Sequence, residues 1–158
     1  MNLEGRALLV FGSRTLDDER IEDEIGKIFL GSDYCFLITA LNPSGVCERV
    51  KHFAKVCKTG IVLIQIGLDQ KRARGMHEAR SITALKMADH LLAIWDGSSR
   101  GTAGEIRLAK KMCVPTTVVQ LEPLHVFDLA IDFNVSKTEE LLDYRAALNR
   151  MKEPDRKG

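Results

Sequence analysis

The stretch LLAIWDGSSRGTAGE, residues 91–105, decides the fold that we expect for this chain. Its five leading apolar residues predict a buried strand, and the small residues 96–102 predict a loop. Apolar positions at helical spacing then predict a helix, through Ile106, Ala109, Met112 and Cys113. A loop that leads from a strand into a helix N-terminus presents free backbone N–H groups and the positive end of the helix dipole. The stretch therefore predicts a site for a phosphate or carboxylate group.

The same order of strand and helix recurs along the whole chain. Further apolar runs at 7–11, 34–38, 61–66 and 116–119 predict four more strands, with helical patterns between them. Strands that are apolar on both faces indicate a parallel sheet that helices cover on both sides. We expect an α/β, Rossmann-like doubly wound fold with a parallel sheet of about five strands, order 3-2-1-4-5, and a C-terminal helical extension.

Two parts of the chain are expected to differ. Residues 1–120 predict the Rossmann-like domain, and residues 121–158 predict a C-terminal extension that begins near Pro123, where the alternation stops. One amphipathic helix is expected in this extension, from the spacing of Leu141, Tyr144, Leu148 and Met151. We expect that helix to pack on the core or on a second subunit, and residues 152–158 to be disordered.

The predicted strand order also locates a ligand site. The first and fourth strands are neighbours where the winding reverses, and ligands bind in the crevice at that point. The loops that leave these strands, 12–15 and 96–102, both combine Gly, Ser and Arg, although neither carries the G-x-G-x-x-G pattern of a dinucleotide site. The predicted ligand-binding residues are Gly12, Ser13, Arg14, Gly97, Ser98, Ser99, Arg100, Gly101 and Thr102.

Composition excludes several classes of function. The net charge of +1 over 158 residues gives no reason to expect nucleic-acid binding. No apolar run approaches the ~20 residues of a membrane span, and the first residues lack a signal-peptide layout. Four cysteines without a C-x-x-C pair predict neither disulfides nor a metal site, and Cys35 and Cys113 are expected in the core. We expect a cytoplasmic protein that uses no cofactor, no metal, no nucleic acid and no membrane.

Thr102 and Glu105 have two interpretations that the residues alone leave open. T-x-x-E before an apolar helical stripe is typical of a capping box, which satisfies the first N–H groups of a helix. Alternatively, Glu105 faces the crevice and orients a ribose hydroxyl, activates water or attacks a sugar carbon. Arg80, near the start of the third predicted helix, is by default a solvated surface charge, and alternatively a phosphate contact.

Several motifs resemble the SLOG superfamily of Rossmann-like proteins over residues 8–119. VFGSR at 10–14 resembles its first-strand signature, and ADHLLAIWDGSSRGT at 88–102 resembles the AD…A-DG-S-GT segment of its YspA-like branch. GMHE at 75–78 is similar to the start of the M-H-E-R-K helix of LONELY GUY-type phosphoribohydrolases, which are often labelled lysine decarboxylase-like. Their P-G-G-x-G-T-x-x-E motif, and the similar segment of nucleoside deoxyribosyltransferases, would place the catalytic glutamate on Glu105.

The chain also departs from the phosphoribohydrolase pattern. Ala79 stands in place of the motif's arginine, and Arg80 in place of its lysine. Asp96-Gly97-Ser98 replaces the leading P-G-G. Residues 39–45, TALNPSG, replace the glycine-rich turn after the second strand, which contributes to phosphate and ribose binding in those enzymes. The resemblance therefore implies ligand binding more directly than it implies hydrolysis.

The leading expectation is a domain that binds a nucleotide or nucleotide-derived small molecule at the carboxyl edge of its sheet. The first alternative is a nucleotide N-glycosidase, a nucleoside 5′-monophosphate phosphoribohydrolase, in which Glu105 activates water or stabilises the cationic sugar and Arg80 holds phosphate. The second alternative is a ligand-free scaffold or partner-binding protein that uses the C-terminal helix. The resemblance further implies a homodimer or a higher homo-oligomer.

Overall fold

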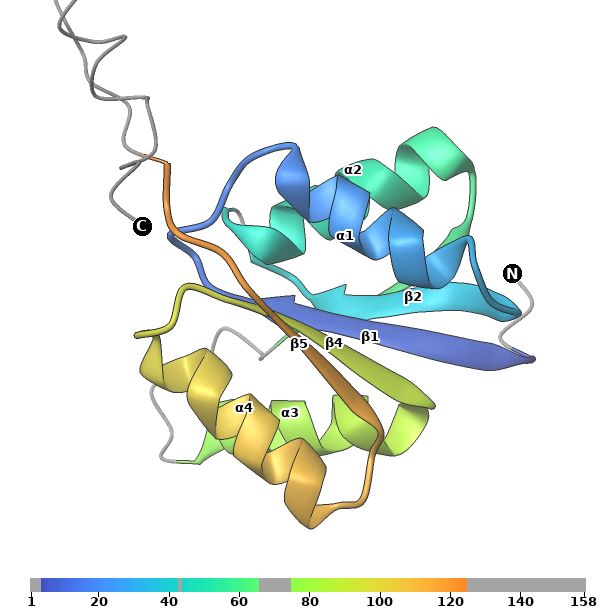
Figure 1. Cartoon of the computed structure of the whole chain (residues 1–158). Coiled ribbons are helices and arrows are strands. Elements are labelled where there is room, and N and C mark those ends of the chain that lie inside the picture. The colour runs from blue at the N-terminus through green and yellow to red at the C-terminus, as the bar shows by residue number, and fades with distance from the viewer. Residues whose placement is uncertain (1–3, 43, 66–74, 125–158) are drawn as a thin grey trace, which may run out of the picture. The chain divides into compact units, whose positions relative to one another are not determined.

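The computed structural model describes residues 4–42, 44–65 and 75–124, in which strands and helices alternate (Figure 1). The strands are β1 (Arg6–Gly12), β2 (Tyr34–Ala40), β3 (Gly60–Ile64), β4 (His90–Trp95) and β5 (Thr116–Gln120). The helices are α1 (Arg20–Phe29), α2 (Val46–Cys57), α3 (Met76–Met87) and α4 (Arg100–Lys111). Each strand and helix predicted for residues 7–119 is therefore present.

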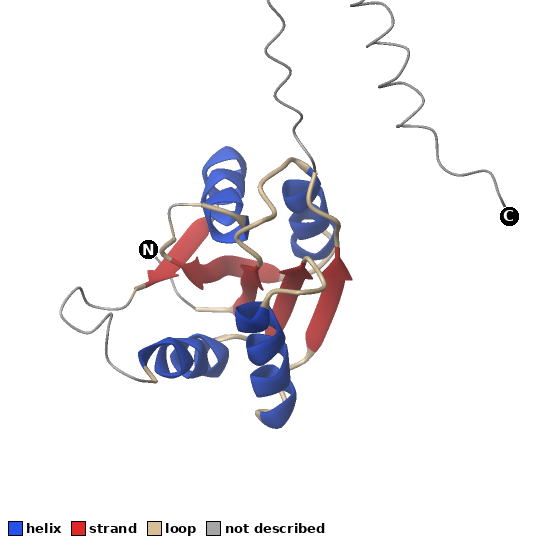
Figure 2. Cartoon of the chain, turned by 90° about the vertical axis from the view of Figure 1, so that its left-hand side faces the viewer, coloured by secondary structure: helices blue, strands red, loops and turns tan. Residues whose placement is uncertain are grey.

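The strands form one parallel sheet in the order β3-β2-β1-β4-β5. Helices α1 and α2 cover one face of this sheet, and α3 and α4 cover the other (Figure 1, Figure 2). The predicted α/β, Rossmann-like doubly wound fold and its strand order are confirmed. Because β1 and β4 are neighbours, the loops that leave these two strands lie at the same edge of the sheet.

Strand β1 is buried on both of its faces. Ala7, Leu9 and Phe11 pack in one apolar cluster with residues of α3 and α4. Leu8 and Val10 pack in a second cluster with residues of α1 and α2. Side chains alternate between the two faces of a strand, so a central strand between two helical layers needs an unbroken apolar run. This requirement explains why residues 7–11 could be assigned from the sequence.

The prediction that Cys35 and Cys113 lie in the core is wrong, since both are exposed. Arg6 pairs with Tyr34 and Ala7 pairs with Phe36, so Cys35 falls at an irregularity in the register of β1 and β2. Cys113 follows the end of α4 with φ at 57°, a left-handed conformation that turns the chain out of the helix. Both cysteines are free thiols.

The chain divides into two compact units, Met1–Leu124 and His125–Gly158. The second unit lies outside the described residues, as do the amphipathic helix and the disordered end predicted there. In the described part of the chain, no helix is long and apolar enough to cross a membrane. Those residues also contain no group of His, Cys, Asp or Glu that could hold a metal ion.

Gly12, the last residue of β1, has no room for a side chain. A Cβ there would collide with the carbonyl oxygen of Ile94 and lie 2.5 Å from Val46 Cγ2. We expect Gly12→Ala to lower the free energy of unfolding by about 1–3 kcal/mol, the usual cost of overpacking, in urea denaturation. Gly101→Ala is the matched control, because a Cβ there meets nothing within 4 Å. Equal losses in the two variants would contradict this expectation.

Candidate functional site

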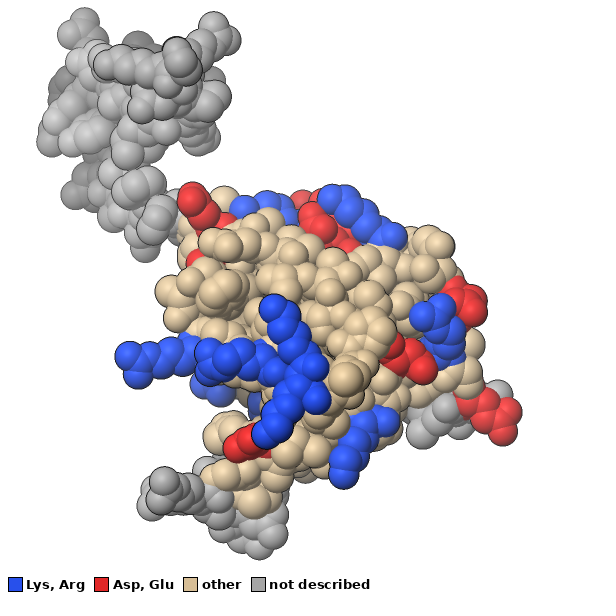
Figure 3. Space-filling model, turned by 60° about the horizontal axis from the view of Figure 1, so that its bottom comes forward, with Lys and Arg blue, Asp and Glu red and all other residues tan. Residues whose placement is uncertain are grey.

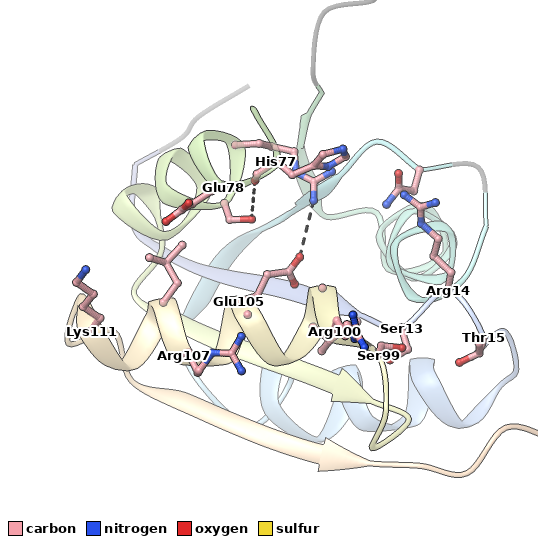
Figure 4. Close-up of a pocket in the computed structure, with 18 residues that line it drawn as sticks. Ser13, Arg14, Thr15, His77, Glu78, Ser99, Arg100, Glu105, Arg107 and Lys111 are labelled. Carbon is pink, nitrogen blue, oxygen red and sulfur yellow. Dashed lines mark hydrogen bonds and ion pairs between the residues drawn. The ribbon is translucent and has the colours of Figure 1, made fainter. Parts of the chain in front are cut away.

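A pocket of about 740 Å³ lies at the carboxyl edge of the sheet, between the loops that follow β1 and β4 and the helices α3 and α4 (Figure 4). The predicted residues that line it are Gly12, Ser13, Arg14, Arg80, Ser99, Arg100, Gly101, Thr102 and Glu105. Gly97 and Ser98 are not among the lining residues. The fold therefore brings most of the predicted site residues together, from segments up to about ninety positions apart in the sequence.

Ser13 connects the two loops. Its backbone N–H donates to the carbonyl oxygen of Ile94 at 3.0 Å, which extends the pairing of β1 and β4 by one residue. Its hydroxyl accepts a hydrogen bond from the backbone N–H of Asp96 at 3.0 Å and lies 3.5 Å from Thr102 Oγ1. Ser13 and Thr102 are both buried. Their hydroxyls hold the start of α4 against the exit of β1, and this contact positions the floor of the pocket.

Asp96 organises the loop between β4 and α4. Its carboxylate accepts hydrogen bonds from the backbone N–H groups of Ser98 and Ser99, at 2.9 and 2.7 Å. The hydroxyls of Ser99 and Thr15 also donate to it, each at 2.7 Å. Burial raises the pKa of Asp96, but these hydrogen bonds outweigh it and lower the pKa well below its ordinary value. The backbone N–H of Ser98 is thus bound by the Asp96 carboxylate and is not free to bind an anionic ligand.

The capping-box interpretation of Thr102 and Glu105 is wrong. Helix α4 begins at Arg100, its N-cap residue is Ser99, and no side chain caps it there. Thr102 therefore lies in the first turn and faces Ser13, while Glu105 lies one turn later. The helix starts early because Asp96 already satisfies the backbone N–H groups just before it. Glu105 is consequently free of a capping role.

Glu105 and Arg80 form a largely buried ion pair across the pocket. Arg80 Nη2 lies 3.7 Å from Glu105 Oε1, and the two side chains are 12% and 15% exposed. Arg80 is thus not the solvated surface charge expected by default. Its guanidinium lies 5.7 Å from the centre of the Phe11 ring, in cation–π contact. Within the described residues, Arg80 Nε and Glu105 Oε2 are buried without a hydrogen-bond partner. This incompletely satisfied pair marks a functional-site candidate.

Burial controls the protonation of Glu105. It raises the pKa of this carboxyl to about 7, although the nearby Arg80 charge opposes the shift. A carboxyl that titrates near neutral pH can act as a general base or donate a hydrogen bond. Most surface carboxylates are fully ionised at physiological pH, so they have no proton to donate in a hydrogen bond. Glu105 therefore lines the pocket, where the second interpretation of this residue places it.

Cations dominate the lining of the pocket. Among the described residues, five Lys or Arg residues line it, against two carboxylates, Glu78 and Glu105. The five are Arg14, Arg80, Arg100, Arg107 and Lys111. Figure 3 presents the α3 and α4 side of the molecule and shows Lys and Arg side chains gathered over one area of it. A pocket with this charge balance attracts anions.

Arg107 and Lys111 were missed in the sequence. They follow Arg100 at i+7 and i+11 on α4, with Gly104 and Leu108 at i+4 and i+8, so all of them share one helical face. The helical spacing of these cations could have predicted a shared charged face, but helical faces were assigned from apolar residues alone. Pocket residues from other elements were also missed or left without a role: Thr15, Asn42, His77, Glu78 and Ser81.

Comparison of the chain with family models, with curated proteins and with solved structures found no match. The resemblance to the SLOG superfamily thus stays an expectation from short motifs. Conclusions about function depend on the geometry of the pocket itself.

The pKa of Glu105 predicts how stability changes with pH. The folded state holds this proton up to a pKa of about 7, whereas an unfolded glutamic acid releases it near 4.5. Between these values the folded state binds more protons, so the Glu105 contribution to stability is present at acid pH and declines as pH rises. We expect the stability of the wild type relative to Glu105→Gln to fall by on the order of 3 kcal/mol across this range.

Urea denaturation from pH 4.5 to 8 measures this difference. Glu78→Gln is the control, since it removes an exposed glutamate from the same pocket and keeps Glu105. We expect the control to retain the decline that depends on Glu105. Parallel stability profiles for the wild type and Glu105→Gln would show that Glu105 titrates normally.

Proposed function

We propose that this pocket binds a nucleotide or a nucleotide-derived small molecule through its phosphate group. One observation carries the proposal: four pocket cations, Arg14, Arg100, Arg107 and Lys111, form no ion pair among the described residues. The chain as a whole has a net charge of only +1, so this surplus is local. Unpaired cations in one concave site favour an anionic ligand.

The start of α4 supports a phosphate position. The first backbone hydrogen bond of this helix runs from Ala103 N–H to the carbonyl oxygen of Ser99. The N–H groups of Arg100, Gly101 and Thr102 precede it, and such groups with the helix dipole suit a phosphate. A Cβ on Gly101 would meet nothing within 4 Å, so this backbone is open to a ligand. Arg14 and Arg100 lie on the same side of the pocket (Figure 4).

The size and the other polar residues of the pocket suit the rest of a nucleotide. Ligand pockets commonly measure roughly 300–1,000 Å³, and this one measures about 740 Å³. Asn42, His77 and Glu78 offer hydrogen-bonding groups for a sugar or a base. The resemblance of residues 88–102 to the SLOG superfamily supports the same ligand class. A homodimer and a cytoplasmic location stay predictions from the sequence.

A second candidate function is hydrolysis of the N-glycosidic bond of a nucleoside monophosphate. The specific observation that favours it is Glu105, which faces the pocket with a pKa of about 7 and one unpartnered oxygen. In this reaction the bond between sugar and base breaks, and its electron pair leaves with the base. Water bonds to the sugar carbon and gives a proton to the Glu105 carboxylate, which passes it to the base. Arg80 would hold the carboxylate in place.

Ligand binding is testable by thermal shift with a panel of nucleotides. A bound ligand at ~100 times its dissociation constant raises the free energy of unfolding by ~2.7 kcal/mol. We expect Arg14→Gln with Arg100→Gln to weaken binding of the same nucleotide roughly tenfold or more, because charged hydrogen bonds to phosphate are lost. Lys110→Gln is the control, since Lys110 is exposed on α4 outside the pocket. Absence of any response in the wild type would overturn the proposal.

Hydrolysis is testable by incubation with nucleoside 5′-monophosphates and chromatography of the free base. If the chain is a glycosidase, we expect Glu105→Gln to reduce base release by about a hundredfold or more, the usual contribution of a general base. Glu19→Gln is expected to retain activity, since Glu19 is exposed and lies outside the pocket. Unchanged activity in Glu105→Gln would remove Glu105 from the mechanism, and no base release from the wild type would leave binding as the function.

A further inference from the structure

The unpaired cations of the pocket form two separate groups. Arg14 and Arg100 lie near the start of α4, whereas Arg107 and Lys111 lie toward its end (Figure 4). At a rise of 1.5 Å per residue, Arg107 is about 10 Å and Lys111 about 16 Å along the helix from Arg100. A phosphate oxygen accepts hydrogen bonds at about 3 Å. One phosphate at the first group therefore leaves the second group without a partner.

Both residues of the second group are exposed and lie on one face of α4. Arg107 and Lys111 are i, i+4 neighbours on one helical face, where two like charges repel each other. Among the described residues, neither forms an ion pair. The helix dipole favours cations in the last turn, which accounts for Lys110 and Lys111 but not for Arg107, one turn earlier. Both Arg107 and Lys111 line the pocket, whereas Lys110 does not.

The stretch between the two groups differs from both. Gly104 lines it without a side chain, and the Glu105–Arg80 pair crosses it. A third phosphate here would meet the Glu105 carboxylate. An uncharged sugar would instead have the hydrogen-bonding groups of this pair beside it. Along α4 the pocket lining is thus cationic at the start of the helix, nearly neutral in the middle and cationic again toward the end.

We propose that Arg107 and Lys111 form a second anion subsite, so that the ligand is a nucleoside with two phosphate groups on separate positions of its sugar. This proposal rests on the proposed function. It distinguishes a nucleoside bisphosphate from a linear polyphosphate, whose charges are contiguous. It also distinguishes this ligand from a nucleic-acid strand, because the pocket offers cations at two places rather than along a continuous track.

Calorimetric titration with the nucleoside 5′-monophosphates of the four bases and with their 3′,5′- and 2′,5′-bisphosphates tests this subsite. We expect at least one bisphosphate to bind roughly tenfold or more tightly than its monophosphate, from added charge-assisted contacts. Arg107→Gln with Lys111→Gln should remove that gain, so that the bisphosphate and its monophosphate bind this variant about equally tightly. Lys110→Gln, which also removes a cation from α4, should retain the gain.

Each result decides between the alternatives. If monophosphates bind and no bisphosphate binds more tightly, the second subsite is wrong and the proposed function stands. If the double variant lowers the affinities for monophosphate and bisphosphate equally, Arg107 and Lys111 act only through the overall positive charge of the pocket, and the second subsite is wrong. If a single-stranded oligonucleotide binds as tightly as the best bisphosphate, the ligand is a polyanion and this proposal is wrong. If no nucleotide binds, both the subsite and the proposed function are wrong.

Discussion

Ser13 makes the contacts on which the geometry of the crevice depends. Its backbone N–H bonds to β4 at Ile94, and its carbonyl oxygen accepts from Leu16 and, at 3.4 Å, from Val46 at the start of α2. Its hydroxyl bonds to Asp96 and lies near Thr102 at the start of α4. One small buried residue thus connects β1, β4 and the starts of two helices. An apolar residue there would leave the Asp96 N–H without this acceptor.

The electrostatics of the pocket follow from that arrangement. Arginines and a lysine from three separate segments meet around one volume, although the chain as a whole is almost neutral. Glu105 lies among them, yet its burial keeps the pKa near 7 rather than near that of an exposed carboxylate. The free-energy cost of removing the carboxylate from water exceeds the attraction of a single ion pair at 3.7 Å. Departures of this kind from the usual rules of packing concentrate at functional sites.

Local patterns predicted the fold well because each of them has a direct physical cause. Residues 7–11 and 91–95 are apolar without interruption, as a strand between two helical layers requires. The spacing of Ile21, Ile25 and Phe29 likewise requires one buried helical face. The errors have local causes too. Asp96 starts α4 earlier than the Thr102–Glu105 spacing implies, and an irregular register exposes Cys35. Neither competing hydrogen bonds nor register can be inferred from a periodicity.

Order and periodicity along the chain were sufficient for the class of fold, for the order of its strands and for the place of the crevice, because these follow from short-range burial and from the handed winding of parallel strands. The chemistry of the crevice required the folded chain. Arg80 pairs with Glu105 across twenty-five positions, and Arg107 and Lys111 join Arg14 from the far end of a helix. The charge state of a carboxyl and the balance of charge in a pocket depend on distances in space and on burial, which no local pattern encodes.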